Sequence, residues 1–473
     1  MSKLEEYRKI FRKIKKYLDY VFYIMFSLKY ILQFLTTTIV WVSVYGKMYS
    51  VPYAIADGIF IVYTVIYLMI ILLFEETDLS NKIVAMTIIV IAFLYVALSE
   101  TSINSIYEYL MIMALALNKS YKKILKITIV EGTTIMLLFL LLSQAGIVKD
   151  HIMSRGRHAL GMVYCTDCGA HLLFLLLSYI VYVDYKLTRE VEAILIFGVL
   201  IEYAIINSKT ATICIVVLIL GLLMNKYKKK IIIAARNVML LIFPIAFGGF
   251  MFLKYLNDRW SDIFPDNTFT DRLYLTTIGI QKYGIALWGR TIHQNGNGGG
   301  GIGGVELLDT NNIHEHILLV VYTLVILIFI ISTLVMIKRN NKFFTSITFV
   351  ISSVLLLMPK IITKLNNDDK LSELNTINHY FFLDNSFVSV LLCQGGIVFI
   401  LIMILGVFIQ YRAYKSRKYE FMFIMCIVVL ECTMEHHMMD ISYNVLFLLG
   451  LTDMLNGGIN NKEENGNRND DAA

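Results

Sequence analysis

The sequence predicts an all-α fold, a polytopic bundle of about fourteen transmembrane helices with a large loop outside the membrane. Three observations predict this class. Hydrophobic residues make up 57% of the 473 residues, charged residues only 16%, and prolines number four, unlike soluble domains. Mean hydropathy is +0.67. The net charge of +6 lies mainly in short Lys and Arg clusters between apolar runs, which indicates membrane topology rather than nucleic-acid binding.

The apolar runs are long enough to cross roughly 30 Å of hydrocarbon as helices. The expected spans are residues 19–42, 53–74, 82–99, 103–118, 126–147, 160–183, 191–207, 209–225, 232–253, 317–337, 343–359, 386–410, 420–433 and 441–456. Together they form a transmembrane domain over residues 19–456. The basic segment 1–18 has no small-residue cleavage site after it, so the first span is expected to be retained. The polar tail 457–473 is expected to be disordered.

The basic clusters predict which side of the membrane each loop faces. With residues 1–18 in the cytoplasm, the later Lys and Arg clusters fall on the same side and both termini are cytoplasmic. Four polar segments then face outside: residues 148–158, 255–315, 359–386 and 431–440. An outer loop of about sixty residues is usually functional or disordered. Apolar side chains between Leu273 and Trp288 predict an amphipathic or re-entrant helix within it.

Three outer arginines are candidate phosphate ligands, because a guanidinium binds phosphate oxygens bidentately. They are Arg157, Arg272 and Arg290. Arginine is disfavoured in short outer loops, so Arg157 opposes the usual bias. Arg272 and Arg290 flank the expected interfacial helix. The alternative is that all three contact lipid headgroups.

The Glu435-His436-His437 segment lies at the outer end of an expected span, where a histidine can act as a general base. The alternative is a polar turn between two helices. A zinc site is disfavoured, because adjacent histidines point in different directions on a helix and HExxH spacing is absent. His314 and His316 carry the same ambiguity.

Two further motifs are interpreted as structural. The CxxC of Cys165 and Cys168 begins an expected span without a second CxxC, so packing is favoured over redox chemistry. The GxGxxG at residues 296–301 follows no strand and lies on the outer side, which argues against dinucleotide binding. Acidic residues within the spans, such as Glu202, form no line across the bilayer, which weakens a transporter interpretation.

Three segments together resemble the Wzy-type polysaccharide polymerases of capsule and exopolysaccharide pathways, within the O-antigen ligase/polymerase superfamily. The segments are residues 157–164 with Asp167, residues 383–387 followed by Gly395 and Gly396, and residues 435–444. A fourth segment, from Arg272 to Gly289, is also similar to that family. All four fall on the face that the basic clusters place outside.

The resemblance implies a metal-independent glycosyltransferase of the GT-C type that needs no cofactor and acts in the bacterial cytoplasmic membrane. Such enzymes transfer a growing glycan from undecaprenyl pyrophosphate onto a new lipid-linked repeat unit. Membrane lipids, a flippase and a chain-length regulator are the implied partners, and nucleic acid is not. Two alternatives stay open: an O-antigen-ligase-like transferase with another acceptor, and a flippase or transporter for lipid-linked oligosaccharides.

The resemblance also implies roles for individual residues. The pyrophosphate would be held by the three outer arginines Arg157, Arg272 and Arg290. The base for the acceptor hydroxyl would be His436, Glu435 or Asp384. Supporting positions are His158, Asn385 and Asn444.

Overall fold

The structure is a computed structural model, and it describes residues 3–39, 79–99, 105–153, 156–227, 230–259, 268–290, 292 and 382–455. Three expected spans, 53–74, 317–337 and 343–359, lie outside the described residues. So do the tail 457–473, the glycine tract with His314 and His316, and parts of both long outer loops.

Helices dominate the described residues, as predicted. The first part of the chain forms α1 (Lys3–Leu35), α3 (Leu79–Leu98), α4 (Ser105–Leu115), α5 (Tyr121–Gln144), the hairpin β1 (Ile152–Met153) and β2 (Arg157–His158), and α6 (Cys165–Tyr182). The middle forms α7 (Arg189–Ile201), the π-helical turn η2 (Glu202–Ile206), α8 (Lys209–Tyr227), α9 (Lys230–Leu240), α10 (Ile242–Arg259) and α11 (Thr268–Tyr283). The last part forms α14 (Ser386–Ser389), the π-helical turn η4 (Val390–Gln394), α15 (Gly396–Lys415), α16 (Tyr419–Cys432) and the 3₁₀ turns η5 (His437–Met439), η6 (Leu448–Leu451) and η7 (Asp453–Leu455).

Five of the described helices are long and apolar enough to cross a membrane: Lys16–Leu35 within α1, α5, α6, Lys209–Lys226 within α8, and α15. The expected span 232–253 is two helices, α9 and α10, bent by 68°, and this pair makes a sixth if it counts as one span. These helices support the membrane class. The expected number of about fourteen spans is not reproduced within the described residues.

Two expected spans are wrong, for the same physical reason. Residues 103–118 contain α4, whose 11 residues rise only about 16 Å, half the hydrocarbon thickness. Residues 441–456 contain the 3₁₀ turns η6 and η7 and no α-helix. Both segments are buried by protein: Leu110 to Leu115 are at most 1% exposed, and Val445 to Leu449 are 0% exposed. An apolar run shows that a segment avoids water, but not whether lipid or protein covers it.

The predicted break near Ser208 is confirmed. Helix α7 continues into η2, and Asn207 ends it with a left-handed φ of 54°, a conformation that asparagine tolerates. Helix α8 then begins at Lys209 and packs against α7 and α6.

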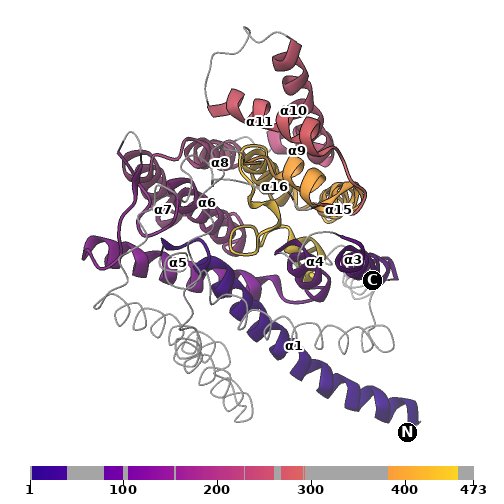
Figure 1. The fold of residues 1–473 in the computed structure, drawn as a ribbon. Helices are drawn as coiled ribbons and strands as arrows, with labels where there is room; N and C mark the ends of the chain where they lie inside the picture. Colours follow the sequence, from indigo (N-terminus) through magenta and orange to yellow (C-terminus); the bar gives the residue numbers. More distant parts are fainter. Residues whose placement is uncertain are drawn as a thin grey trace, which may run out of the picture.

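The bundle places α16 at its centre (Figure 1). Helix α16 packs against α8, α9, α10 and α15, α6 packs against α5 and α8, and the long α1 packs against α5. The chain that follows α16 folds back over the bundle as the buried turns η5 to η7. The N-terminus of α6, the end of α1 and the turn after α16 therefore lie near one another.

Two glycines dock α11 and its following loop onto the start of α15. Gly289 and Gly395 have φ values of 81° and 93°, which glycine adopts freely. A Cβ on Gly395 would lie 2.3 Å from the Gly289 nitrogen, and one on Gly289 would lie 2.4 Å from the Cys393 carbonyl oxygen. The backbone N–H of Arg290 donates to that carbonyl at 3.2 Å. This backbone contact fixes the position of α11, which carries Arg272.

Candidate active site

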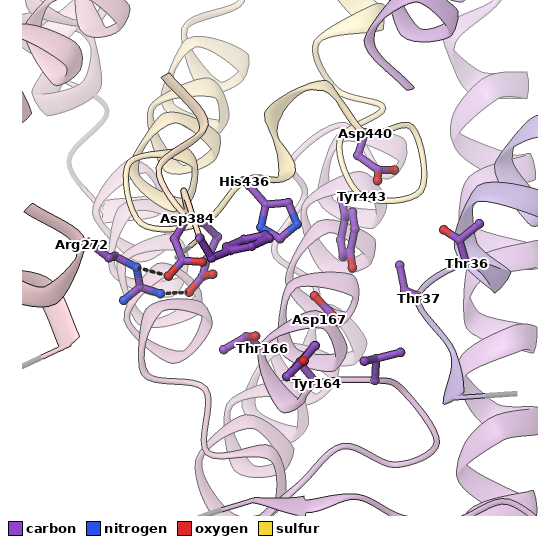
Figure 2. A pocket seen from close by; sticks show the side chains of 13 residues that line it. Thr36, Thr37, Tyr164, Thr166, Asp167, Arg272, Asp384, His436, Asp440 and Tyr443 are labelled. Atoms are coloured by element: carbon purple, nitrogen blue, oxygen red, sulfur yellow. Dashed lines mark hydrogen bonds and ion pairs between the residues drawn. The ribbon is translucent and has the colours of Figure 1, made fainter. Parts of the chain in front are cut away.

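A cavity of about 180 Å³ lies where the N-terminus of α6 meets the end of α1 and the turn after α16 (Figure 2). Its lining contains one arginine, four carboxylic acids, one histidine and several hydroxyl groups. The residues are Thr36, Thr37, Val163, Tyr164, Thr166, Asp167, Arg272, Phe382, Asp384, Glu435, His436, Asp440 and Tyr443.

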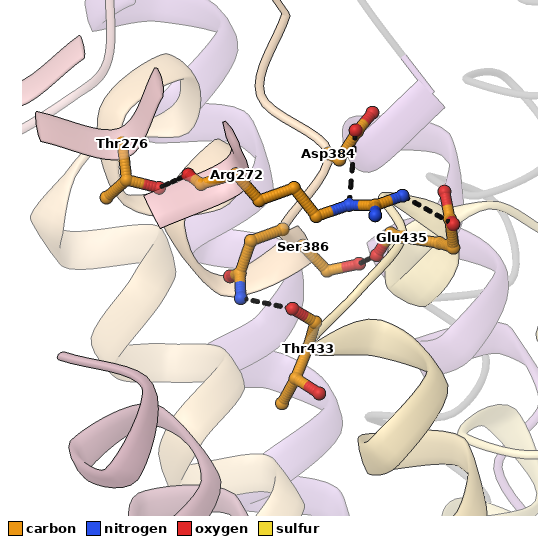
Figure 3. A network of polar contacts seen from close by, with 7 residues as sticks. Arg272, Thr276, Asp384, Ser386, Thr433 and Glu435 are labelled. Carbon is orange, nitrogen blue, oxygen red and sulfur yellow. Dashed lines mark hydrogen bonds and ion pairs between the residues drawn. The ribbon is translucent and has the colours of Figure 1, made fainter. Parts of the chain in front are cut away.

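Arg272 bridges two of the carboxylates (Figure 3). Its Nε lies 3.2 Å from Asp384 Oδ2, and its Nη2 donates to Glu435 Oε1 at 2.7 Å. All three side chains are less than 10% exposed. The triad joins α11, the chain before α14 and the turn after α16, which are as far as 163 residues apart in sequence.

The triad carries more negative than positive charge. Burial raises the pKa of Glu435 to about 7, with Arg272 opposing the rise. Burial also raises the pKa of Asp384, again against the effect of Arg272. One guanidinium cannot neutralise two buried carboxylates, so the triad retains a proton at a higher pH than ordinary carboxyls do.

Hydrogen bonds from α14 hold the turn that carries Glu435. Asn385 caps α14 by accepting from the Val388 N–H at 3.0 Å, and its Nδ2 donates to the Thr433 carbonyl at 2.7 Å. Ser386 Oγ donates to the Glu435 carbonyl at 2.5 Å and accepts from the Met438 N–H. Asn385 and Ser386 thus fix the position of the turn that carries Glu435.

Asn444 and His158 do not line the cavity; they form hydrogen bonds within loops. Asn444 Nδ2 donates to the Met438 carbonyl at 2.9 Å, and its own carbonyl accepts from Tyr109. His158 Nδ1, in β2, lies 2.5 Å from Oδ2 of Asp150, which precedes β1.

His436 lines the cavity, and its side chain is exposed. Phe382 packs edge-on against its ring, with centroids 5.1 Å apart. Burial, and then the charge of Arg272, lower the pKa of His436 to about 4. The imidazole is therefore neutral at neutral pH and able to accept a hydrogen bond, but it is a weak proton acceptor.

A stack of rings runs from His437 into the bundle. His437 stacks on Tyr443, Tyr443 on His171, and His171 on Phe34, with centroid separations of 3.9, 3.9 and 3.8 Å. Neither ring nitrogen of His437 has a hydrogen-bond partner among the described residues. The stack fixes the ring of Tyr443 at the cavity wall.

Glu435, His436 and His437 also offer donor atoms for a metal, all within 4.8 Å of one another. The expectation that the two histidines diverge on a helix was wrong, because His436 precedes the 3₁₀ turn η5 that begins at His437, and their ring centroids are 4.5 Å apart. The Arg272 guanidinium already contacts Glu435. A cation bound there would compete with this fixed positive charge.

The other two predicted arginines lie outside the cavity lining. Arg157, in β2, is half-buried and close enough for its charge to act on Glu435. Arg290 donates to the Tyr283 carbonyl at the end of α11. The structure thus brings together Arg272, Asp384, Glu435 and His436 of the predicted residues, and it places Arg290 in a local contact.

Several lining residues were not predicted from the sequence. Asp440 and Tyr443 lie within the segment that resembles the polymerases, and Asp167 lies within both that resemblance and the CxxC motif. No local pattern marks Thr36 or Thr37, which follow α1 and lie within the first expected span, 19–42. Their contribution becomes visible only when α1, α6 and the chain after α16 are brought together.

Comparisons with models of protein families, with curated proteins and with solved structures find no match to this chain. Its function is therefore argued from the chemistry of the cavity rather than from kinship.

Proposed function

We propose that this protein is a membrane glycosyltransferase that polymerises undecaprenyl-pyrophosphate-linked oligosaccharide repeat units at the outer face of the bacterial cytoplasmic membrane. One observation carries the proposal: Arg272 is fixed at the wall of a cavity that also holds acidic and hydroxyl side chains. A cation of this kind suits a departing pyrophosphate, and carboxyl and hydroxyl groups suit a sugar.

Arg272 would stabilise the leaving group. Its two carboxylate contacts hold the guanidinium in place before substrate arrives, and such preorganisation makes a donor effective in the transition state. The raised pKa of Glu435 reduces the repulsion that an incoming pyrophosphate would meet. A protonated Glu435 could also donate a hydrogen bond to a phosphate oxygen.

The proposed reaction is a displacement at the anomeric carbon of the donor glycan. An acceptor hydroxyl oxygen forms the new bond to that carbon, and the bond to the pyrophosphate oxygen breaks. The pyrophosphate leaves with the electron pair, and the hydroxyl proton passes to a base. The cavity offers His436, Glu435 and Asp384 for this role, as the resemblance implies, and it also offers Asp167.

The test is polymerisation by the purified full chain in lipid nanodiscs, supplied with lipid-linked repeat units isolated from the source cells. We expect a ladder of longer glycans. Arg272→Gln should lower the rate by about 10²–10³-fold, the usual loss for one preorganised donor. Arg236→Gln is the matched control, because Arg236 lies over the Tyr414 ring and does not line the cavity.

Other products would point to the alternatives. Transfer only to an acceptor that carries no lipid would favour a ligase. Movement of intact lipid-linked units across the bilayer, without any longer glycan, would favour a flippase and refute the polymerase.

A further inference from the structure

Three of the four carboxylic acids in the cavity lining are already engaged by protein groups. Asp384 and Glu435 contact Arg272. Asp440 accepts from the Ser442 N–H at 2.8 Å, from the Ser442 hydroxyl at 2.6 Å and from Gln33 at 3.3 Å. These groups have limited capacity left for a ligand.

Asp167 is the fourth acid. It shares a hydrogen bond with the Tyr443 hydroxyl and feels the charges of Glu435, Asp440 and Asp384, but it contacts no cation among the described residues. Figure 2 shows its side chain in the cavity, beside Thr166 and below Tyr443. Asp167 lies in the first turn of α6, where the helix dipole favours a carboxylate. The ring of Tyr443 stacks on His171. This stacking fixes the Tyr443 hydroxyl beside Asp167, so the Asp167–Tyr443 pair is preorganised.

The surroundings of Asp167 differ from those of Arg272. The wall near it carries the uncharged hydroxyls of Thr36, Thr37, Tyr164 and Thr166. The hydroxyls of Thr36 and Thr37 donate to the Gln33 and Phe34 carbonyls, so they offer a ligand their lone pairs. Such acceptors suit the hydroxyl groups of a polyol rather than an anion.

We propose that Asp167 is the catalytic base, which receives the proton of the acceptor sugar's hydroxyl, and that the hydroxyl-lined end of the cavity binds this acceptor sugar. This inference rests on the proposed glycosyl transfer. In the step, the hydroxyl oxygen bonds to the anomeric carbon as its proton moves to an Asp167 oxygen, and the pyrophosphate departs with the electron pair towards Arg272. The low pKa of His436 makes its imidazole a weak proton acceptor.

The test compares three Asp167 variants with a control in the polymerisation assay. Asp167→Asn should lower turnover by about 10²–10⁴-fold, the usual contribution of a general base, without changing the amount of folded protein. Asp167→Glu should recover part of the rate. Asp184→Asn is the control, because Asp184 follows the other end of α6 and pairs with Lys122 at 2.7 Å.

Two readouts separate a base from a structural residue. Formate, a small external carboxylate, should partly restore turnover to Asp167→Ala. The acidic limb of the pH–rate profile should disappear in Asp167→Asn. The titrating groups that act on Asp167 remain unchanged in that variant; they are Glu435, Asp440, Asp384 and Tyr443.

Each contrary outcome has a distinct meaning. A wild-type chain that forms no glycan product refutes the proposed function, and this inference with it. An Asp167→Asn variant that works within threefold of wild type refutes only the role of Asp167. A loss that neither formate nor Asp167→Glu relieves, with an unchanged pH profile, also refutes the base and assigns Asp167 to folding.

Discussion

Two buried ion clusters among the described residues have different surroundings. Lys29 of α1 and Glu108 of α4 form an ion pair at 3.1 Å, with side chains 1% and 5% exposed, and neither lines the cavity. Arg272 is nearly as buried, but it is shared by two carboxylates and forms part of a cavity wall. Burial of charge therefore does not by itself mark a site. Excess charge beside an accessible space does.

The Lys29–Glu108 pair should affect stability and leave activity unchanged. Lys29→Met strands the Glu108 carboxylate in the core, so we expect a loss of about 3–5 kcal/mol in the free energy of unfolding. The double variant Lys29→Met/Glu108→Leu should recover most of this loss, because an apolar pair of similar volume needs no charge compensation. Unfolding in nanodiscs measures stability, and glycan formation measures activity.

Unfolding of Arg272→Gln in nanodiscs compares the stability contribution of the Arg272 triad with that of the Lys29–Glu108 pair. Its two carboxylates line the cavity and have raised pKa values, so they can retain a proton when Arg272 is lost. The loss of stability should therefore be smaller than that of Lys29→Met. Equal losses for the two variants, or inactivity of the Lys29/Glu108 double variant, would show that the two clusters do not differ in kind.

Because two carboxylates share the single positive charge of Arg272, the free energy of unfolding should depend on pH. Burial raises the pKa of Glu435 from 4.5 to about 7, so the folded state binds a proton more tightly than the unfolded state. The stabilisation is complete below about pH 4.5 and is lost as the pH rises through about 7. We expect stability to fall by about 1–3 kcal/mol over this interval.

Glu435→Gln should flatten this part of the stability curve, since an amide does not titrate. His436 acts in the opposite direction: its pKa is lowered, so its contribution is present above about pH 6.5 and is lost as the pH falls. A curve for Glu435→Gln that declines as steeply as that of wild type would assign the pH dependence to other groups.

The sequence predicts the membrane-type helical class and much of the helix order, because apolar length and the breaks between runs are local properties. The expected spans 126–147 and 160–183 correspond to α5 (Tyr121–Gln144) and α6 (Cys165–Tyr182). The buried segments 103–118 and 441–456 are predicted wrongly, because protein and lipid bury apolar side chains alike. Tertiary packing decides between them.

The candidate site was predictable to the extent that its residues carry charge. Arg272, Glu435 and His436 were singled out as polar side chains in outer segments, and Asp384 through the resemblance to the polymerases. All four line the same cavity in the structure. Thr37 and Tyr443 were not, because a hydroxyl acquires meaning only from its neighbours. Arg290 looked equivalent to Arg272, but the glycine contact beside it directs its guanidinium to the Tyr283 carbonyl.

The smallest expected effect compares two helix caps. Asn385 caps α14 beside the Arg272 triad and Thr188 caps α7 away from it; the latter accepts from the Val191 N–H at 3.4 Å. Replacing either by alanine should cost about 0.5–2 kcal/mol in the free energy of unfolding. Only Asn385→Ala should also lower turnover, because it releases the Thr433 carbonyl and with it the turn that carries Glu435. Equal turnover in the two variants would mean that the turn keeps its place without Asn385, and that the remaining hydrogen bonds from Ser386 are sufficient to position Glu435.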